Sequence, residues 1–151
     1  MIVAIGSDHA GFMYKESLKK HLTLLNIEAL DEGTYNSSAS DYPDYAFKVS
    51  RRVVDKQVDF GILICGTGIG MSIAANKVKG IRAALVTTAF TAGSAKTHNH
   101  ANVITFGSRV NTIEEVINFL NIFINTKASE QERHINRVKK ISKYEVEEWE
   151  K

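Results

Sequence analysis

Residues 60–72 read FGILICGTGIGMS, an apolar run that ends in a reactive side chain and a glycine-rich turn. The unbroken apolar run from Phe60 to Cys65 is typical of a strand buried on both faces of a parallel sheet. Glycines let backbone N–H groups approach an anion closely, and the helix expected after the turn adds partial positive charge at its N-terminus. We therefore expect a ligand site at the carboxyl end of this strand, where open α/β sheets bind ligands.

The turn differs from two common phosphate-binding motifs. It is not a Walker A loop, because no Gly-Lys-Ser/Thr ends it. It is not a dinucleotide fingerprint, because it follows the third expected strand and lacks the GxGxxG spacing. Taken alone, the segment is equally compatible with a tight strand-to-helix turn around a packed cysteine.

Cys65 is the chain's one cysteine, so no intrachain disulfide can form. A lone cysteine is typical of an intracellular thiol that is either buried or catalytic. An ordinary thiol has a pKa of about 8.5 and is only slightly ionised at neutral pH. A helix terminus typically stabilises the anion by only about 0.3 to 1 kcal/mol. A basic role therefore requires a ligand or a further hydrogen-bond donor, and we expect Thr67 to supply one.

Apolar runs and helical patterns alternate along the rest of the chain, which predicts a parallel sheet covered by crossover helices. A second helix should carry Pro43 in its first turn and end near Asp55. The other expected strands are Ile2–Ile5, Ile27–Leu30, Arg82–Val86 and Val103–Phe106. Apolar faces at helical spacing are formed by Tyr14, Leu18, Leu22 and Leu25 in the first helix and by Ala46, Val49 and Val53 in the second. The pairs Thr112 with Glu115 and Ser129 with Glu132 are spaced as capping boxes.

Length and composition limit the class of protein. With 151 residues and 44% hydrophobic content, we expect one domain over residues 1–151. A net charge of +2 is too small to predict a nucleic-acid partner. No signal peptide and no apolar stretch near the roughly 20 residues of a membrane helix is visible, so we expect a cytoplasmic protein. The charged run from Glu145 to Lys151 is interpreted as a solvated helix end.

Polar side chains flank two other strands. Asp8 and His9 follow the first strand and should share the carboxyl edge with Cys65, although Asp8 could also serve as an N-cap. His98, Asn99 and His100 precede the fifth strand, where they suit proton transfer to a sugar oxygen or simply form a polar helix end.

Three arginines suit recognition of a phosphate. Arg133 and Arg137 are four residues apart and should project from one helix face, and Arg109 follows the fifth strand. Three guanidinium groups converging on a phosphate would give bidentate, charge-assisted binding. Ordinary surface contacts are the alternative for the helical pair. His21 and His134 are interpreted as surface or packing residues.

Six segments together resemble the type B ribose-5-phosphate isomerases. Their order and spacing match that family from residue 2 to about residue 140. The segments are SDHAG (Ser7 to Gly11), DYP (Asp41 to Pro43), CGTGIGMSIAANK (Cys65 to Lys77), GIRAAL (Gly80 to Leu85), HNHANV (His98 to Val103) and FGSR (Phe106 to Arg109).

The resemblance implies a Rossmann-like three-layer fold with a five-stranded parallel sheet. It also implies interconversion of ribose 5-phosphate and ribulose 5-phosphate through a cis-enediolate, without metal or cofactor. By the same resemblance the enzyme is a homodimer with shared active sites and a C-terminal helix that extends to the partner, and tetramers stay open. Cys65 would be the base, His98 the acid that opens the ring, and Thr67 a further catalytic group. The resemblance assigns substrate binding to Asp8, His9, Gly66, Gly68, Ile69, Gly70, Asn99, Arg109, Arg133 and Arg137.

Several alternatives stay open. His100 could compete with His98 for the acid role, and the same chemistry could act on allose or galactose 6-phosphate. A non-catalytic phosphate- or nucleotide-binding module would use the glycine turn only as a cradle, but it would not require Cys65 and His98. A Cys/His hydrolase would need a histidine within hydrogen-bond reach of Cys65.

Overall fold

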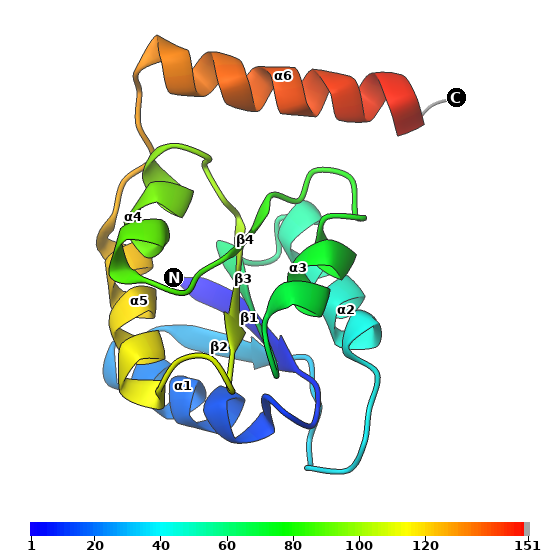
Figure 1. Ribbon diagram of the computed structural model, residues 1–151, viewed down its shortest axis with the longest axis vertical. Helices are drawn as coiled ribbons and strands as arrows, with labels where there is room; N and C mark the ends of the chain where they lie inside the picture. The colour runs from blue at the N-terminus through cyan, green and yellow to red at the C-terminus, as the bar shows by residue number, and fades with distance from the viewer. Residues whose placement is uncertain (150–151) are drawn as a thin grey trace.

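The computed structural model describes residues 1–149 and shows a five-stranded, all-parallel sheet between two layers of helices (Figure 1). The strand order is β2-β1-β3-β5-β4, so β3 lies at the centre and β4 at one edge. This is the Rossmann-like arrangement that the alternating pattern predicts. The strands are β1 (Ile2–Ser7), β2 (Glu28–Asp31), β3 (Phe60–Cys65), β4 (Ala83–Leu85) and β5 (Val103–Gly107).

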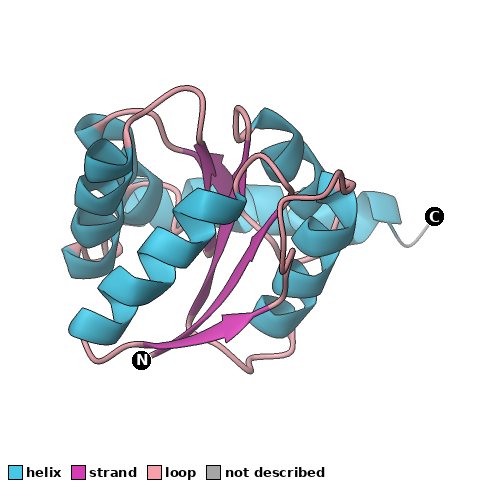
Figure 2. Cartoon of the chain, turned by 90° about the horizontal axis from the view of Figure 1, so that it is seen from below, coloured by secondary structure: helices cyan, strands magenta, loops and turns pink. Residues whose placement is uncertain are grey.

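The helices cover both faces of the sheet, as the view from below shows (Figure 2). Helices α1, α4 and α5 pack on one face, and α2 and α3 pack on the other. The helices are α1 (Phe12–Leu24), α2 (Tyr42–Val54), α3 (Ile69–Ala75), α4 (Ala89–Thr97), α5 (Ile113–Asn125) and α6 (Glu132–Trp149).

Strand β3 divides the core into two halves, because successive side chains of a strand point to opposite faces. Ile62 and Ile64 contribute to the cluster beneath α1, α4 and α5. Leu63 and Cys65 belong to the cluster beneath α2 and α3. The thiol of Cys65 therefore projects from the end of β3 toward the side where α3 begins.

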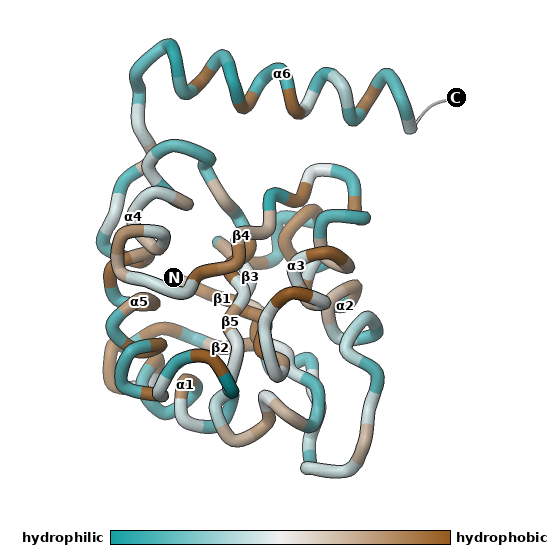
Figure 3. Tube along the Cα trace, in the orientation of Figure 1, coloured by the Kyte–Doolittle hydropathy of each residue, from teal (hydrophilic) through white to brown (hydrophobic). Residues whose placement is uncertain are grey.

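Helix α6 lies apart from the two layers. It crosses the molecule beyond the amino ends of β4 and β5, opposite the carboxyl edge of the sheet (Figures 1 and 2). Apolar residues recur along it (Figure 3), yet His134 alone is buried among its described residues. Ile141, Tyr144 and Trp149 are each about half exposed or more. No helix within residues 1–149 combines the length and apolar character needed to cross a membrane.

Most of the expected elements are confirmed, with differences at their ends. Thr112 and Glu115 form a complete capping box for α5, and Pro43 lies in the first turn of α2, which Asp55 caps. Leu25 was expected on the buried face of α1, but it is 42% exposed because the helix ends at Leu24. The capping box at Ser129 is wrong: its hydroxyl accepts from the amide of residue 131, and α6 begins only at Glu132. Of the charged run that ends at Lys151, residues 150 and 151 lie outside the described part.

Two lysines of α1, two acidic side chains and their ion pairs form a charged network, of which Lys15 is completely buried. The Lys15 side chain has no exposed surface, and its Nζ donates to Asp31 Oδ2 at 2.6 Å and to Glu16 Oε1 at 2.9 Å. Lys19 Nζ also donates to Asp31 Oδ2, at 2.6 Å. Burial by itself raises the pKa of Asp31, but the bonds from the two lysines outweigh it and hold that pKa below its usual value.

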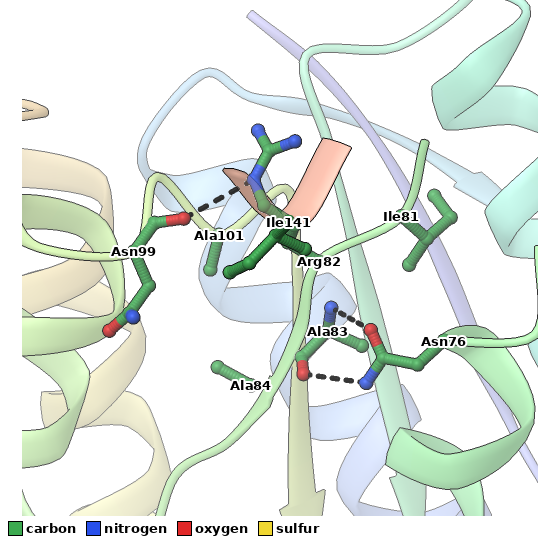
Figure 4. A pocket seen from close by; sticks show the side chains of 8 residues that line it. All are labelled: Asn76, Ile81, Arg82, Ala83, Ala84, Asn99, Ala101 and Ile141. Carbon is green, nitrogen blue, oxygen red and sulfur yellow. Dashed lines mark hydrogen bonds between the residues drawn. The ribbon is translucent and has the colours of Figure 1, made fainter. Parts of the chain in front are cut away.

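The edge strand β4 is covered mainly by the side chain of Asn76, with a longer bond from Ser72 Oγ to the Ala83 carbonyl at 3.4 Å. Asn76 donates from Nδ2 to the carbonyl of Ala83 at 2.9 Å, and its Oδ1 accepts from the Ala83 amide at 2.8 Å (Figure 4). The amide group of Asn76 thus pairs with both backbone groups that Ala83 presents outward, as a neighbouring strand would.

Candidate active site

Cys65 ends β3 directly before the glycine turn, and it is 5% exposed. The backbone N–H of Gly68 donates to its Sγ at 3.1 Å, within the turn. Thr67 was expected as the donor, but its hydroxyl oxygen accepts from the amide of Ile69 at 3.3 Å. The thiol therefore lies against the start of α3 and is held there by a backbone amide.

Gly68 requires the absence of a side chain for two reasons. Its φ is +77°, in the left-handed region that favours glycine. An added Cβ would also lie 2.6 Å from the Leu85 side chain and 2.9 Å from the backbone of Phe106. The turn can therefore bring the Gly68 amide onto Sγ only because no side chain is present at this position.

Asp8 and His9 reach the same edge from β1, as predicted from the parallel order of the strands. The Asp8 amide donates to the Ile64 carbonyl at 3.2 Å, next to Cys65. Asp8 Oδ1 accepts from the Gly11 amide at 3.0 Å, whereas the N-cap of α1 is Gly11 itself. The amide of His9 donates to Ser40 Oγ at 3.1 Å, which ties this turn to the segment before α2.

Arg109 lies beside the glycine turn. Its amide donates to the Gly66 carbonyl at 2.9 Å, and one guanidinium nitrogen would be 3.1 Å from a Cβ at Gly66. Tyr42 was not singled out by the sequence, but its ring would lie 2.7 Å from a Cβ at Gly70. Only its position in the segment DYP could have drawn attention to it. The carboxyl edge thus carries a thiol, a carboxylate, an imidazole, a guanidinium and a phenol on the segments that follow β1, β2, β3 and β5.

His98 and Asn99 lie at the other end of the sheet. His98 caps the C-terminus of α4, and the chain then enters β5 at Val103. The His98 ring stacks on that of His134 in α6, with centroids 4.5 Å apart and planes inclined by 11°. The interpretation of His134 as a packing residue is consistent with this stack.

His134 is 5% exposed, and its Nδ1 is buried without a hydrogen-bond partner. Burial lowers the pKa of His134, and the charges of Arg133 and Arg137 and the neighbouring His98 and His100 lower it further. His134 is consequently neutral at physiological pH, and its stack with His98 fastens α6 to the end of α4.

The three arginines do not converge within one chain. Arg109 is at the carboxyl edge, whereas Arg133 and Arg137 lie in the first turns of α6, where both act on His134, the residue that stacks on His98. Cys65 pairs with Gly107 at the far end of β5. The strand between Val103 and Gly107 spans about 13 Å at the usual rise per residue. The predicted site residues therefore form two separate groups, one at each end of the sheet.

The comparisons with known proteins bear on both groups. The family model described as "Ribose/Galactose Isomerase" matches residues 3–141. The chain belongs to the ribose/galactose isomerase family. Among its relatives, a putative sugar phosphate isomerase of Bacillus subtilis is 47% identical over 96% of this chain and 97% of that protein. Ribose-5-phosphate isomerase B of Escherichia coli is 42% identical over 95% of each chain.

Solved structures of the family have the same fold. Ribose-5-phosphate isomerase B of Clostridium thermocellum superimposes with a TM-score of 0.95 at 39% identity, covering 97% of this chain and 99% of that one. The Mycoplasma genitalium enzyme, solved with bound ribulose-5-phosphate, gives a TM-score of 0.91 at 41% identity and 97% coverage of both chains. Membership in the family therefore extends over both groups of candidate residues. Within residues 1–149 no three His, Cys, Asp or Glu side chains are grouped as metal ligands would be.

Proposed function

We propose that this chain interconverts ribose 5-phosphate and ribulose 5-phosphate. The observation that carries the proposal is the placement of Cys65, whose Sγ accepts a backbone amide at the carboxyl end of the central strand. A passive phosphate cradle does not need a thiol at this point. Shift of a proton between adjacent carbons does need a base beside a group of N–H donors.

In this mechanism the thiolate of Cys65 removes the proton from C2 of the open-chain aldose. The C–H electron pair forms the C1–C2 double bond, and the aldehyde electrons move to O1, which gives a cis-enediolate. The glycine turn and the start of α3 stabilise the negative charge, because backbone dipoles and a helix N-terminus favour an anion. Cys65 then returns the proton to C1, and the proton of the C2 hydroxyl is transferred to O1, which gives the ketose.

Ribose 5-phosphate must first open its furanose ring, and His98 is proposed as the acid and base for that step. One chain cannot place His98 beside its own Cys65, because β5 separates them. We therefore propose a homodimer in which each site takes Cys65 from one subunit and His98 from the other. The exposed apolar residues of α6 are available to pack on the partner. A homodimer with a two-fold axis has one self-complementary interface and two equivalent shared sites of this kind.

The other predicted residues fit the same arrangement. Asp8 and His9 would contact the sugar hydroxyls at the edge that holds Cys65. Asn99, Arg133 and Arg137 would approach from the partner, and the two α6 arginines would join Arg109 around the phosphate. The reaction needs no cofactor in this scheme, and its sugar-phosphate substrate is a cytoplasmic metabolite, which favours that location.

Two variants test the assignment of roles. Ribulose 5-phosphate cannot form a five-membered ring, because its C5 oxygen carries the phosphate. Cys65→Ala should abolish turnover in both directions, since both pass through the enediolate. His98→Asn should lose turnover of ribose 5-phosphate but keep most of the solvent-deuterium exchange that Cys65 causes in ribulose 5-phosphate. Near wild-type activity of Cys65→Ala would rule out the proposed base.

Hexose 6-phosphates are the second candidate substrates, because the matching family includes galactose isomerases. The ratio kcat/KM measures discrimination between competing substrates. It should be compared for ribose 5-phosphate, allose 6-phosphate and galactose 6-phosphate without added metal. A higher value for a hexose phosphate would keep the mechanism and change the substrate.

A further inference from the structure

The side chain of Arg82 connects the start of β4 to the segment that carries His98 and Asn99. Its Nε lies 3.2 Å from the Asn99 carbonyl oxygen and 3.1 Å from that of His100. Its Nη2 donates to the His100 carbonyl at 2.9 Å. Figure 4 shows the first of these bonds, with the side-chain amide of Asn99 directed away from Arg82. One guanidinium group thus holds two consecutive carbonyls.

The positive charge of Arg82 interacts with backbone carbonyl groups. Among residues 1–149 no carboxylate lies within ion-pair distance of it, and Glu145 acts on it only at longer range. Burial lowers the pKa of Arg82, and Glu145 opposes that shift. The two carbonyls follow the C-terminus of α4, where the helix dipole places partial negative charge. A half-buried cation at this position therefore stabilises the end of α4 and the turn that follows it.

The segment that Arg82 contacts includes a residue in an unfavourable backbone conformation. His100 has a φ of +48°, a left-handed value that is unfavourable for a residue other than glycine. Its ring Nε2 lies 3.0 Å from the Ser129 carbonyl oxygen, on the segment that precedes α6. The Arg82 backbone amide donates to Asn102 Oδ1 at 2.7 Å. The Arg82 guanidinium supplies three of the contacts that fix the backbone here.

We propose that Arg82 is a positioning residue, which orients Asn99 and the adjoining His98 so that they meet substrate in the partner's site. The proposal rests on the proposed isomerase function. Arg82 itself does not touch the reacting atoms. A displacement of about 1 Å in a catalytic group can lower the rate about a hundredfold. A more mobile backbone at His98 and Asn99 should therefore lower the turnover rate.

The surroundings of Arg82 make its side chain hard to replace. A cavity of about 250 Å³ lies beside it, lined also by Asn76, Ile81 and Ile141. A shorter side chain would leave this space to water without filling it. Lysine would present a single ammonium in place of the planar fork that reaches both carbonyls. The cavity is also large enough to admit a free guanidinium ion.

The test compares Arg82→Ala and Arg82→Lys with Arg51→Ala, which removes an exposed arginine near the end of α2. We expect Arg82→Ala to lower kcat/KM for ribose 5-phosphate by about ten- to a hundredfold. Deuterium exchange into open-chain ribulose 5-phosphate does not require ring opening by His98. Its rate should therefore fall by a factor at least about five times smaller than the fall in kcat/KM for ribose 5-phosphate. Arg82→Lys should recover part of the loss, and free guanidinium should restore activity to Arg82→Ala alone. Equal losses in both assays, or no loss, would overturn the proposal.

Hydrogen exchange separates failure of this inference from failure of the proposed function. The amides of His98, Ala101 and Asn102 donate to carbonyls of α4 and Arg82. In Arg82→Ala these amides should exchange at least about tenfold faster, while those of residues 66–70 keep their wild-type rates. Wild-type protein without isomerase activity would refute the function whatever the exchange shows. An active wild type with unchanged exchange in Arg82→Ala would refute the role of Arg82.

Discussion

Mixing two inactive variants should restore activity if the site is shared between subunits. Cys65→Ala removes the base, and His98→Asn removes the ring-opening acid. Each group must come within about 3 Å of its own atom of the sugar, and those atoms are neighbours, so the two side chains must lie within about 9 Å of each other. Along one chain they are separated by the whole of β5, about 13 Å. Complementation should therefore occur only between chains.

The size of the effect follows from the two-fold arrangement. Random reassociation of equal amounts makes about half of the dimers heterodimers, and each heterodimer has one site with both groups intact and one with neither. The mixture should reach about a quarter of wild-type activity on ribose 5-phosphate.

The assay needs a control mixture and a count of the heterodimers that form when subunits are exchanged. The subunits are mixed after mild denaturation, heterodimers are counted by native mass spectrometry, and ribulose 5-phosphate formation is followed without added metal. Cys65→Ala mixed with the double variant Cys65→Ala/His98→Asn should stay inactive. If heterodimers form but the mixture is no more active than its parents, Cys65 and His98 of the same chain serve one site and the shared-site reasoning is wrong.

Three further predictions concern stability. Asp31→Ala should lower the free energy of unfolding by about 3 kcal/mol in urea denaturation, because it removes the main partner of buried Lys15, whereas Lys15→Met should cost clearly less. Because the folded-state pKa of Asp31 is lowered, its contribution is present above about pH 4 and lost on further acidification, and Asp31→Asn should abolish that slope. His134 has a lowered pKa, so wild-type Tm should fall as the pH drops below about 6.5, and a flat His134→Phe profile would confirm the source. Gly68→Ala should lower both Tm and turnover, whereas Gly93→Ala, within α4, should raise Tm slightly, because its Cβ would only make an ordinary contact with Ile122 at 3.7 Å.

The sheet was predictable because its inner strands β1, β3 and β5 are buried on both faces and therefore read as continuous apolar runs. Helix α4 was not predicted, since its sequence of small residues, AFTAGSAKT, carries no apolar stripe. The start of α6 was misplaced because the sequence at Ser129 fits a capping box, while the chain there is instead held by the amide of Ser129 on the Thr97 carbonyl. A local capping box of Thr88 and Thr91 starts α4, whereas a tertiary contact fixes the segment before α6.

The carboxyl-edge half of the site was predictable for a topological reason: in a parallel sheet, residues that follow neighbouring strands meet at one edge. Cys65, Asp8 and Arg109 follow that rule. Convergence of the three arginines stays a prediction that needs a second subunit, because helical spacing says which residues share a face but not where the helix lies. The contacts of Tyr42 and Arg82 depend on packing between distant segments, which no local pattern reports.

The side chain of Asn76 has a consequence for assembly. An exposed edge strand ordinarily offers its backbone groups to a strand from another molecule. At Ala83 these groups are already bonded to the Asn76 amide, so a ten-stranded sheet cannot be made by joining two copies through β4. The same two hydrogen bonds guard the molecule against fibril-like growth from this edge. The surfaces left for contact with a second copy are then the helices, the loops and the other edge strand, β2.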